Sequence, residues 1–168
     1  DECGNSSIFE QILDLVDTTA PVLTIPADYT VECSDELVLG AATVIDNCDI
    51  DVDVVLTEAI AEGCGASYVL TRTWVATDDC DNSSTASQTI TVVDTTAPVL
   101  TIPADYTAEC SDAHPMDAAS ATDNCGAVTI DVVETTIAGA CAGDYSITRE
   151  FTATDDCGNA TSSTQTIT

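Results

Sequence analysis

The fifteen residues VDTTAPVLTIPADYT begin at Val16 and begin again, letter for letter, at Val93. The likeness extends further, because residues 17–36 and 94–113 are identical at all but two positions. The same offset of 77 residues places four cysteines of the first copy on four of the second: Cys33, Cys48, Cys64 and Cys80 on Cys110, Cys125, Cys141 and Cys157. Self-similarity at a fixed period is typical of tandem arrays. We therefore predict a terminal strand of a preceding repeat over 1–16, a first repeat over 17–93 and a second over 94–168, all belonging to a longer row of modules.

Composition limits the classes of partner. The chain of 168 residues has 30 Asp and Glu against two Arg and no Lys, which gives a formal net charge of −28. Charge repulsion excludes an ordinary nucleic-acid or anionic-membrane partner and favours cations. The hydrophobic content of 45% is nevertheless enough for a folded core.

Short runs rich in Val, Ile and Thr, bounded by Pro, Gly, Asp and Asn, predict β-strands rather than helices. In the first repeat we place them at 22–25, 29–33, 41–45, 50–57, 67–77 and 85–93. Alternation over 145–153 turns one set of side chains inward: Tyr145, Ile147, Arg149, Phe151 and Ala153. Over 50–57 the inward set is Ile50, Val52, Val54 and Leu56. The fold class predicted is all-β, a tandem row of disulfide-stapled immunoglobulin-like β-sandwich repeats.

Nine cysteines in regularly spaced sets of four indicate disulfides, and hence an oxidising, extracytoplasmic compartment. Following the strand direction puts Cys48 and Cys80 at one end of the first module and Cys33 and Cys64 at the other. Of the three pairings possible within a module, this favours Cys33–Cys64 with Cys48–Cys80, and in the second repeat Cys110–Cys141 with Cys125–Cys157. The sequential pairing would join opposite ends of a sandwich, too far apart for a disulfide. Cys3 is expected to pair with a residue that precedes this segment.

Several phrases carry a family resemblance: DTTAPVLTIP, ATDNCG, ATDDCGN and SQTITVVDTTAP. They resemble the hyalin-repeat (HYR-like) Ig-like modules of large secreted surface proteins, especially the cysteine-containing arrays of Bacteroidetes adhesins and gliding-associated filaments. The resemblance implies an extracellular, cell-surface structural role. Four cysteines per module depart from the commoner hyalin-repeat pattern, so the family does not support a particular disulfide connectivity.

The repeated phrase is interpreted as a joint. Strand 85–93 runs into Asp94 without a Gly/Ser-rich linker, and Pro98 restricts the backbone, so successive modules should join stiffly. The topology also brings acidic loops to the entry end of each module. Candidate metal ligands are Asp17, Asp46, Asn47, Asp78 and Asp79 in the first repeat, and Asp94, Asp123, Asn124, Asp155 and Asp156 in the second. Calcium prefers such oxygen ligands, so Ca²⁺ is the cofactor predicted; the alternative is that these residues only form turns.

Other polar residues are given structural roles. Arg72 and Arg149 lie on inward faces, where an ion pair with a carboxylate is expected because an unpaired buried charge is costly. Asn5, Asn82 and Asn159 each begin an N-x-S/T triplet, but they occupy one recurring turn, which favours a turn role over glycosylation.

Three functions stay open. The first is a structural segment of an adhesin stalk or filament, a stiff rod with calcium-stabilised joints, whose partners are neighbouring repeats or identical subunits. The second is an adhesive module that binds a glycan or a surface. The third is filament assembly through residues 8–16, an unusually apolar strand that could add to the sheet of a neighbouring chain. One histidine, no lysine and no nucleophile–base spacing make an enzyme unexpected, and membrane insertion by this segment is not expected either.

Overall fold

The computed structural model describes residues 2–4, 6–141 and 143–168. Over these ranges it contains eleven β-strands and no helix, which confirms the prediction of an all-β fold. It follows that no helix of the described chain could cross a bilayer. The chain divides into two compact units. The first unit comprises Asp1–Ile25, Ala41–Thr57 and Thr73–Ser87, and the second comprises Pro26–Gly40, Glu58–Arg72 and Gln88–Thr168.

The first repeat contains two sheets. Strands β1 (Val22–Thr24) and β3 (Thr43–Ile45) form an antiparallel pair. The larger sheet has the order β2-β6-β5-β4, with bounds Tyr29–Glu32, Ser83–Val93, Tyr68–Thr77 and Asp53–Glu62. Strand β2 pairs with β6 in parallel. This parallel pairing lets the chain leave β2 and leave β6 at the same end of the sheet.

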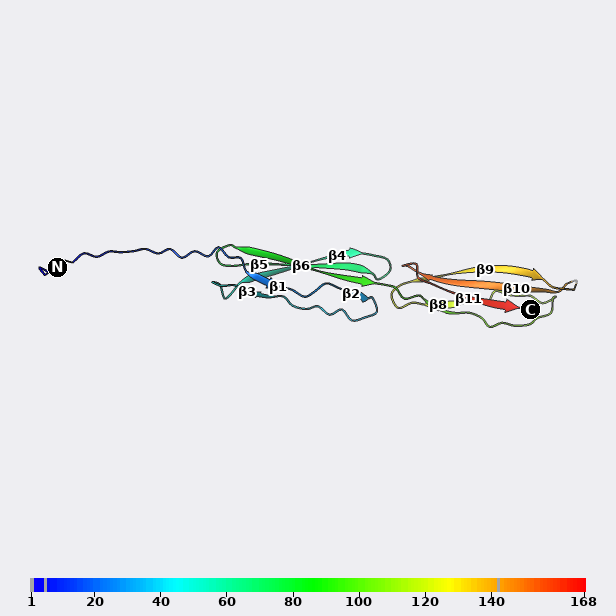
Figure 1. Ribbon diagram of the computed structural model, residues 1–168. Helices are drawn as coiled ribbons and strands as arrows, with labels where there is room; N and C mark the ends of the chain where they lie inside the picture. Colours follow the sequence, from blue (N-terminus) through cyan, green and yellow to red (C-terminus); the bar gives the residue numbers. More distant parts are fainter. Residues whose placement is uncertain (1, 5, 142) are drawn as a thin grey trace. The chain divides into compact units, whose positions relative to one another are not determined.

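The second repeat lies entirely within the second unit. Strands β7 (Val99–Thr101) and β8 (Ser120–Thr122) pair with each other. The other sheet has the antiparallel order β11-β10-β9, with bounds Ala160–Ile167, Tyr145–Asp155 and Val128–Ala138, and these strands lie side by side in Figure 1. Contacts of β7 with β10 and β11, and of β8 with β9, close the two sheets into a β-sandwich.

Strand β10 supplies the core of the second repeat. Its inward residues Ile147, Arg149, Phe151 and Ala153 expose 7, 2, 1 and 0% of their surface. The predicted alternation is therefore confirmed. In β5, Leu70, Arg72, Trp74 and Ala76 occupy the same positions and are buried too.

The predicted strand over 50–57 begins later and is more open than expected. Strand β4 starts at Asp53, because the amide of Asp51 donates to Asp49 Oδ1 at 2.9 Å and closes a turn that leaves Ile50 fully exposed. The strand is also the last in its sheet, so Val54 and Leu56 remain 38 and 40% exposed. The inward assignment of Ile50 was wrong for this reason.

No strand forms over residues 8–16 either, where sequence predicted one. Its six large apolar residues are 75–95% exposed: Ile8, Phe9, Ile12, Leu13, Leu15 and Val16. A β-strand needs a neighbour to satisfy its backbone hydrogen bonds, and this segment pairs with none of the described strands.

Candidate functional site

Two disulfides cross the boundary between the repeats. Cys33, which follows β2, bonds to Cys125 in the loop before β9, with a Cα–Cα distance of 5.8 Å. Cys64, which follows β4, bonds to Cys157 after β10, with a Cα–Cα distance of 5.0 Å. All four cysteines belong to the second unit. We call this group, together with Asp94, the joint.

The pairings predicted within modules, Cys33–Cys64 and Cys125–Cys157, were wrong. Strand direction did place Cys33 and Cys64 at one end of the first repeat, and both bond to the second repeat, but the bonds run across the boundary. The physical reason is the missing linker. Because β6 leads directly into Asp94, the exit end of the first repeat lies against the entry end of the second. A backbone hydrogen bond from Ala66 N to Cys125 O (3.0 Å) holds them there, and one from Cys33 N to Val93 O (2.8 Å) ties the end of β2 to the end of β6.

The pairs Cys48–Cys80 and Cys110–Cys141 were predicted as well. Among the residues that the structure describes, these four cysteines form no disulfide, and all four are exposed. The prediction of these two disulfides was therefore wrong as well. Their positions match those of the bonded cysteines one period away.

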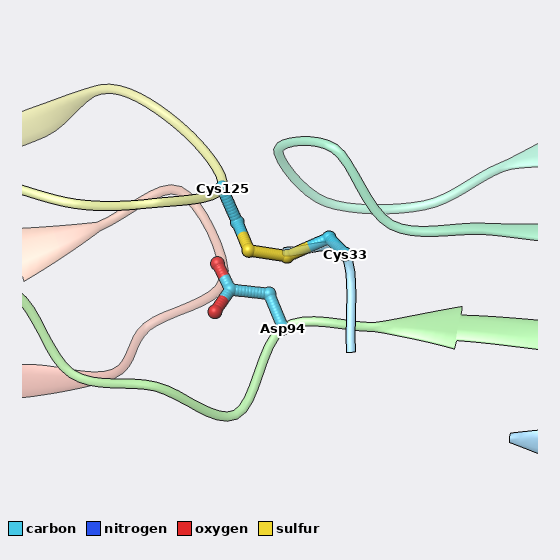
Figure 2. A group of neighbouring side chains, drawn as sticks. All are labelled: Cys33, Asp94 and Cys125. Carbon is cyan, nitrogen blue, oxygen red and sulfur yellow. A yellow bond between two sulfur atoms is a disulfide. The ribbon is translucent and has the colours of Figure 1, made fainter. Parts of the chain in front are cut away.

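Three carboxylates gather beside the first disulfide. Asp94 follows β6, Asp123 lies between β8 and β9, and Asp155 ends β10, and each offers an oxygen within 4.8 Å of the others. Figure 2 shows the Asp94 side chain next to the Cys33–Cys125 bond. Because both sulfurs are bonded to each other, they provide no thiolate for a soft metal. The carboxylate oxygens are the ligands that this site can offer.

The negative charge of Asp94 has few stabilising interactions. Asp94 is 8% exposed, and neither its Oδ2 atom nor that of Asp123 has a hydrogen-bond partner among the described residues. Burial raises the pKa of Asp94 above its ordinary value; the Thr96 amide opposes this, and the charges of Asp123, Asp155 and Glu32 add to it. An arrangement of unsatisfied, mutually repelling carboxylates is one that a divalent cation would stabilise.

Asp155 behaves differently because it holds a turn. Its Oδ1 accepts the amides of Cys157 (2.8 Å) and Asn159 (2.9 Å), and its Oδ2 accepts Asn159 Nδ2 (2.9 Å). Burial alone would raise the pKa of Asp155, but these hydrogen bonds outweigh it and lower the pKa below its usual value. Asp155 is therefore an ionised anchor of the cluster at neutral pH.

The asparagine of that turn also reaches the joint. Asn159 Nδ2 donates to the backbone oxygen of Asp94 at 3.1 Å, and Asn82 Nδ2 makes the corresponding bond to Asp17 O at 3.4 Å. The turn role predicted for these two asparagines is confirmed. The triplet predicted at Asn5 lies outside the described residues.

The first unit contains an equivalent cluster of Asp17, Asp46 and Asp78, again with oxygens within 4.8 Å of one another. Asp46 Oδ2 has no hydrogen-bond partner in the described chain. For Asp78, burial again acts to raise the pKa, and hydrogen bonds from Asn82 and from the Cys80 amide lower it below the ordinary value. The structure thus brings together three of the predicted aspartates in each repeat.

Of the four other predicted ligands, Asp79 and Asp156 belong to neither carboxylate cluster of the described residues; the other two are Asn47 and Asn124. Asp156 Oδ2 instead accepts the Ala127 amide at 3.3 Å, and Asn47 Nδ2 donates to Cys48 Sγ at 3.0 Å. Glu32 was missed, although it accepts the Thr95 amide at 3.1 Å and the Thr95 hydroxyl. A signal existed, since a glutamate precedes the first cysteine of both repeats.

Both arginines form the ion pairs that were expected. Arg149 Nε donates to Glu134 at 2.8 Å, and Arg72 Nε donates to Glu58 at 2.9 Å. Arg149 also donates to the backbone oxygens of Pro115 (2.9 Å) and His114 (2.8 Å). These contacts give the arginines a structural role in each core.

Comparison with known proteins finds a family model that matches part of the chain. Residues 21–92 match the model of the HYR-like domain with 4 cysteines. This match supports an HYR-like, Ig-like module over the first repeat. The four cysteines that depart from the commoner hyalin-repeat pattern are thus the feature by which this family is described. A search of curated proteins found no match.

Solved structures with some likeness are extracellular domains of protocadherins. The Protocadherin GammaB4 extracellular domain matches with a TM-score of 0.34 and 14% identity, over 88% of this chain and 33% of that one. The Protocadherin gammaB7 EC3-6 cis-dimer structure matches with a TM-score of 0.34 and 13% identity, over 88% of this chain and 50% of that one. The chain therefore spans a third to a half of these proteins.

Proposed function

We propose that this chain is a non-enzymatic structural segment of an extracellular surface protein, used as an adhesin stalk or as the repeating body of a filament. The observation that carries the proposal is the pair of disulfides that joins one repeat to the next. With a single disulfide, one module could still rotate about that bond relative to the next. Two disulfides and a strand without a linker restrict the angle between modules. A spacer that must hold its ends apart requires this restriction.

The compartment follows from the same bonds. Disulfides persist in oxidising, extracytoplasmic surroundings, and the HYR-like match over residues 21–92 supports an extracellular module. Two buried aromatic residues support a spacer over a sugar-binding platform, because Trp74 and Phe151 are 3 and 1% exposed and offer no stacking face.

Small-angle X-ray scattering tests the role of the joint. Replacing Cys33 and Cys64 by alanine should broaden the distribution of molecular dimensions, because the modules gain freedom while each keeps its fold by circular dichroism. The matched control replaces Cys48 and Cys80, which are unbridged in the described chain. Superimposable scattering from the joint variant and the unmodified chain would rule the proposal out.

We also propose that calcium occupies the cluster of Asp94, Asp123 and Asp155. Support comes from the buried Oδ2 atoms of Asp94 and Asp123, which have no hydrogen-bond partner among the described residues. Three carboxylates provide hard oxygen ligands, and Ca²⁺ tolerates the irregular loops that carry them. Bound calcium would remove their repulsion and stiffen the joint.

Isothermal titration calorimetry with calcium, and separately with magnesium, tests this site. Asp123→Asn should weaken calcium binding at the second-unit cluster by at least about tenfold, because one charged ligand is lost. Asp131→Asn removes the same charge from an exposed position of β9 and should leave the affinity unchanged. Heats that are equal for both variants would assign these aspartates to turns alone.

A second candidate function concerns residues 8–16, whose apolar side chains are exposed. The 77-residue offset aligns Gln11, Leu13 and Leu15 with the buried residues Gln88, Ile90 and Val92 of β6. The segment therefore has the pattern of a final strand that completes the sandwich of another module, by strand addition. A synthetic peptide of residues 6–16 labelled with a fluorophore should bind the chain if addition occurs, and a Leu13→Asp, Leu15→Asp peptide should not.

A further inference from the structure

The two disulfides of the joint differ in how readily a thiol can reach them. Cys64 is exposed, and its partner Cys157 is half-buried. Cys125 is only 5% exposed, and its partner Cys33 is half-buried. We propose that the Cys64–Cys157 bond is a site of exchange with small thiols such as glutathione, while the other bond persists and keeps the repeats attached. The effect of this exchange on stiffness rests on the structural role proposed above.

Access to the sulfurs favours the Cys64–Cys157 bond. Exchange begins when a thiolate attacks one of the two bonded sulfurs, so access helps to decide which bond reacts. Cys64 lies in the turn between β4 and β5, in a run of exposed residues over 61–66. Cys125 lies against the first repeat, where its backbone oxygen accepts the Ala66 amide at 3.0 Å. A small thiol therefore reaches Cys64 more readily than Cys125.

Negative charge protects the Cys33–Cys125 bond. Its two sulfurs and a carboxylate oxygen of Asp94 lie within 4.8 Å of one another, and Figure 2 shows the three side chains together. Asp123 and Asp155 add to this charge, because each has an oxygen within 4.8 Å of the Asp94 carboxylate. These charges repel an attacking thiolate, and together with burial they destabilise the thiolate that would have to leave.

A hydroxyl group favours the opening of the Cys64–Cys157 bond. Ser67 Oγ lies 3.5 Å from Cys157 Sγ and 3.7 Å from Cys64 Sγ, and it is the donor because bonded sulfurs carry no proton. When Cys64 Sγ is attacked, Cys157 leaves as a thiolate, to which the Ser67 hydroxyl can donate. Asp156, the neighbour of Cys157 in sequence, directs its Oδ2 to the Ala127 amide at 3.3 Å. A stabilised thiolate leaves more readily, so exchange should be faster at this bond.

The exchange consists of two balanced steps. A glutathione thiolate, formed by loss of a proton to solvent, attacks Cys64 Sγ and forms a mixed disulfide. The electron pair of the broken bond goes to Cys157 Sγ, which takes up a proton. A second glutathione thiolate attacks the glutathione sulfur of the mixed disulfide and releases Cys64 as a thiolate, which is protonated in turn. In total, two glutathione molecules are oxidised to glutathione disulfide, and one disulfide of the chain is reduced to two thiols.

Opening this bond would loosen the joint without separating the repeats. The Cys33–Cys125 bond and the hydrogen bond from Ala66 N to Cys125 O do not depend on it. With one disulfide left, one module could rotate about that bond relative to the next. Thiols in the surroundings would thus lower the stiffness of the segment.

Differential alkylation of the unmodified chain tests the order of opening. Thiols already present are blocked with N-ethylmaleimide, and the chain is treated with glutathione at mildly alkaline pH in EDTA, so that no divalent cation neutralises the carboxylates. New thiols are then labelled with iodoacetamide and mapped by mass spectrometry. The Cys64–Cys157 bond should open at least about tenfold faster than the Cys33–Cys125 bond, with the mixed disulfide on Cys64. Equal rates, the reverse order, or a mixed disulfide on Cys157 would overturn the inference.

Variants separate the effect of charge from that of access. Asp94→Asn should speed the opening of the Cys33–Cys125 bond several-fold with glutathione, which is anionic, and less with cysteamine, whose ammonium group offsets its thiolate. Asp131→Asn removes the same charge from an exposed position of β9 and is the matched control, with unchanged rates. Ser67→Ala should slow the opening of the Cys64–Cys157 bond. If Asp94→Asn and Asp131→Asn gave the same rates, the protection by charge would be ruled out.

Small-angle X-ray scattering distinguishes this inference from the proposed function. Once the Cys64–Cys157 bond alone has been opened and alkylated, the distribution of molecular dimensions should broaden. If the labelling follows the expected order while the scattering stays the same, the exchange site is supported and the stiffening role of the two bonds is contradicted. Labelling in the reverse order would overturn the exchange site whatever the scattering shows.

Discussion

A single arginine decides how the core of the second repeat is satisfied. Arg149 is 2% exposed, yet its guanidinium reaches the carboxylate of Glu134 and two backbone oxygens, while its stem lies among the apolar residues of β10. Glu134 is different, since its side chain is 42% exposed and water can take the place of its partner. The two ends of this ion pair should therefore have unequal effects on stability.

Arg149→Leu and Arg149→Ala should each lower the free energy of unfolding by about 3–5 kcal/mol, because the buried oxygens of His114 and Pro115 lose their donors. Glu134→Gln should cost no more than about 1 kcal/mol, since the partly exposed pair is screened by solvent. Urea unfolding of the three variants measures this. If Arg149→Leu were as stable as the unmodified chain, the stem alone would carry the role of the residue.

Asp94 should make the chain less stable as the pH rises, provided that divalent cations are absent. Because its pKa is raised in the folded state, the carboxyl group stabilises the fold fully below its ordinary value of 3.8 and loses that contribution as pH rises through the raised value. Asp94→Asn removes this loss, so its melting temperature relative to the unmodified chain should increase from about pH 3 to about pH 7.

The same comparison with Asp131→Asn, which lies outside the cluster, is the control for the loss of one negative charge and should give a smaller difference than Asp94→Asn. The charges of Asp123, Asp155 and Glu32 interact with the Asp94 carboxylate, so the loss of these interactions is part of the effect of the Asp94→Asn change. A difference for Asp94→Asn that fell with rising pH would mean that the carboxylate is stabilised by an interaction other than those described.

Among the elements, strands with a period-two pattern and a partner on both sides were the ones that sequence predicted well. β10 lies between β9 and β11, so each inward residue has a core to enter, and its alternation was confirmed from Ile147 to Ala153. β4 lies at a sheet edge, and the Asp49 turn delays its start. Residues 8–16 have the alternation without any partner strand. The sequence shows the alternating pattern of a strand. Whether the strand forms depends on a neighbouring strand, which the pattern does not identify.

Phe151→Ala should therefore be far more damaging than a change on the opposite face of β10. Phe151 is 1% exposed, and removing its ring from a closed core costs about 3–5 kcal/mol in lost burial and cavity formation. Thr152→Ala, the neighbouring residue, loses only a hydroxyl contact with Ser162 at 2.9 Å and should cost about 0.5 kcal/mol. Thermal unfolding of both variants provides the comparison, and similar melting temperatures would place the core elsewhere.

At the scale of the whole molecule, two disulfides join the repeats, which no linker separates. The aspartate clusters were predictable because each loop position follows from strand direction within one module. The disulfide partners were not, because strand direction says which cysteines share an end but not what lies against that end. The contact between Ala66 and Cys125, across the repeat boundary, supplies this information.

Each bridge of the joint should contribute about 4–5 kcal/mol to stability. The bonded cysteines are separated by 92 and 93 residues, so each bond removes a large amount of loop entropy from the unfolded chain. The double variant Cys33→Ala, Cys125→Ala should lose this contribution in urea unfolding, and because its unfolded chain lacks this cross-link and exposes more surface, the slope of the free energy against urea should be steeper. Cys48→Ala, at a position that is exposed and unbridged in the described chain, should change the free energy of unfolding by less than about 0.5 kcal/mol. Equal losses in the double variant and in Cys48→Ala would show that the bonds across the repeat boundary do not stabilise the chain.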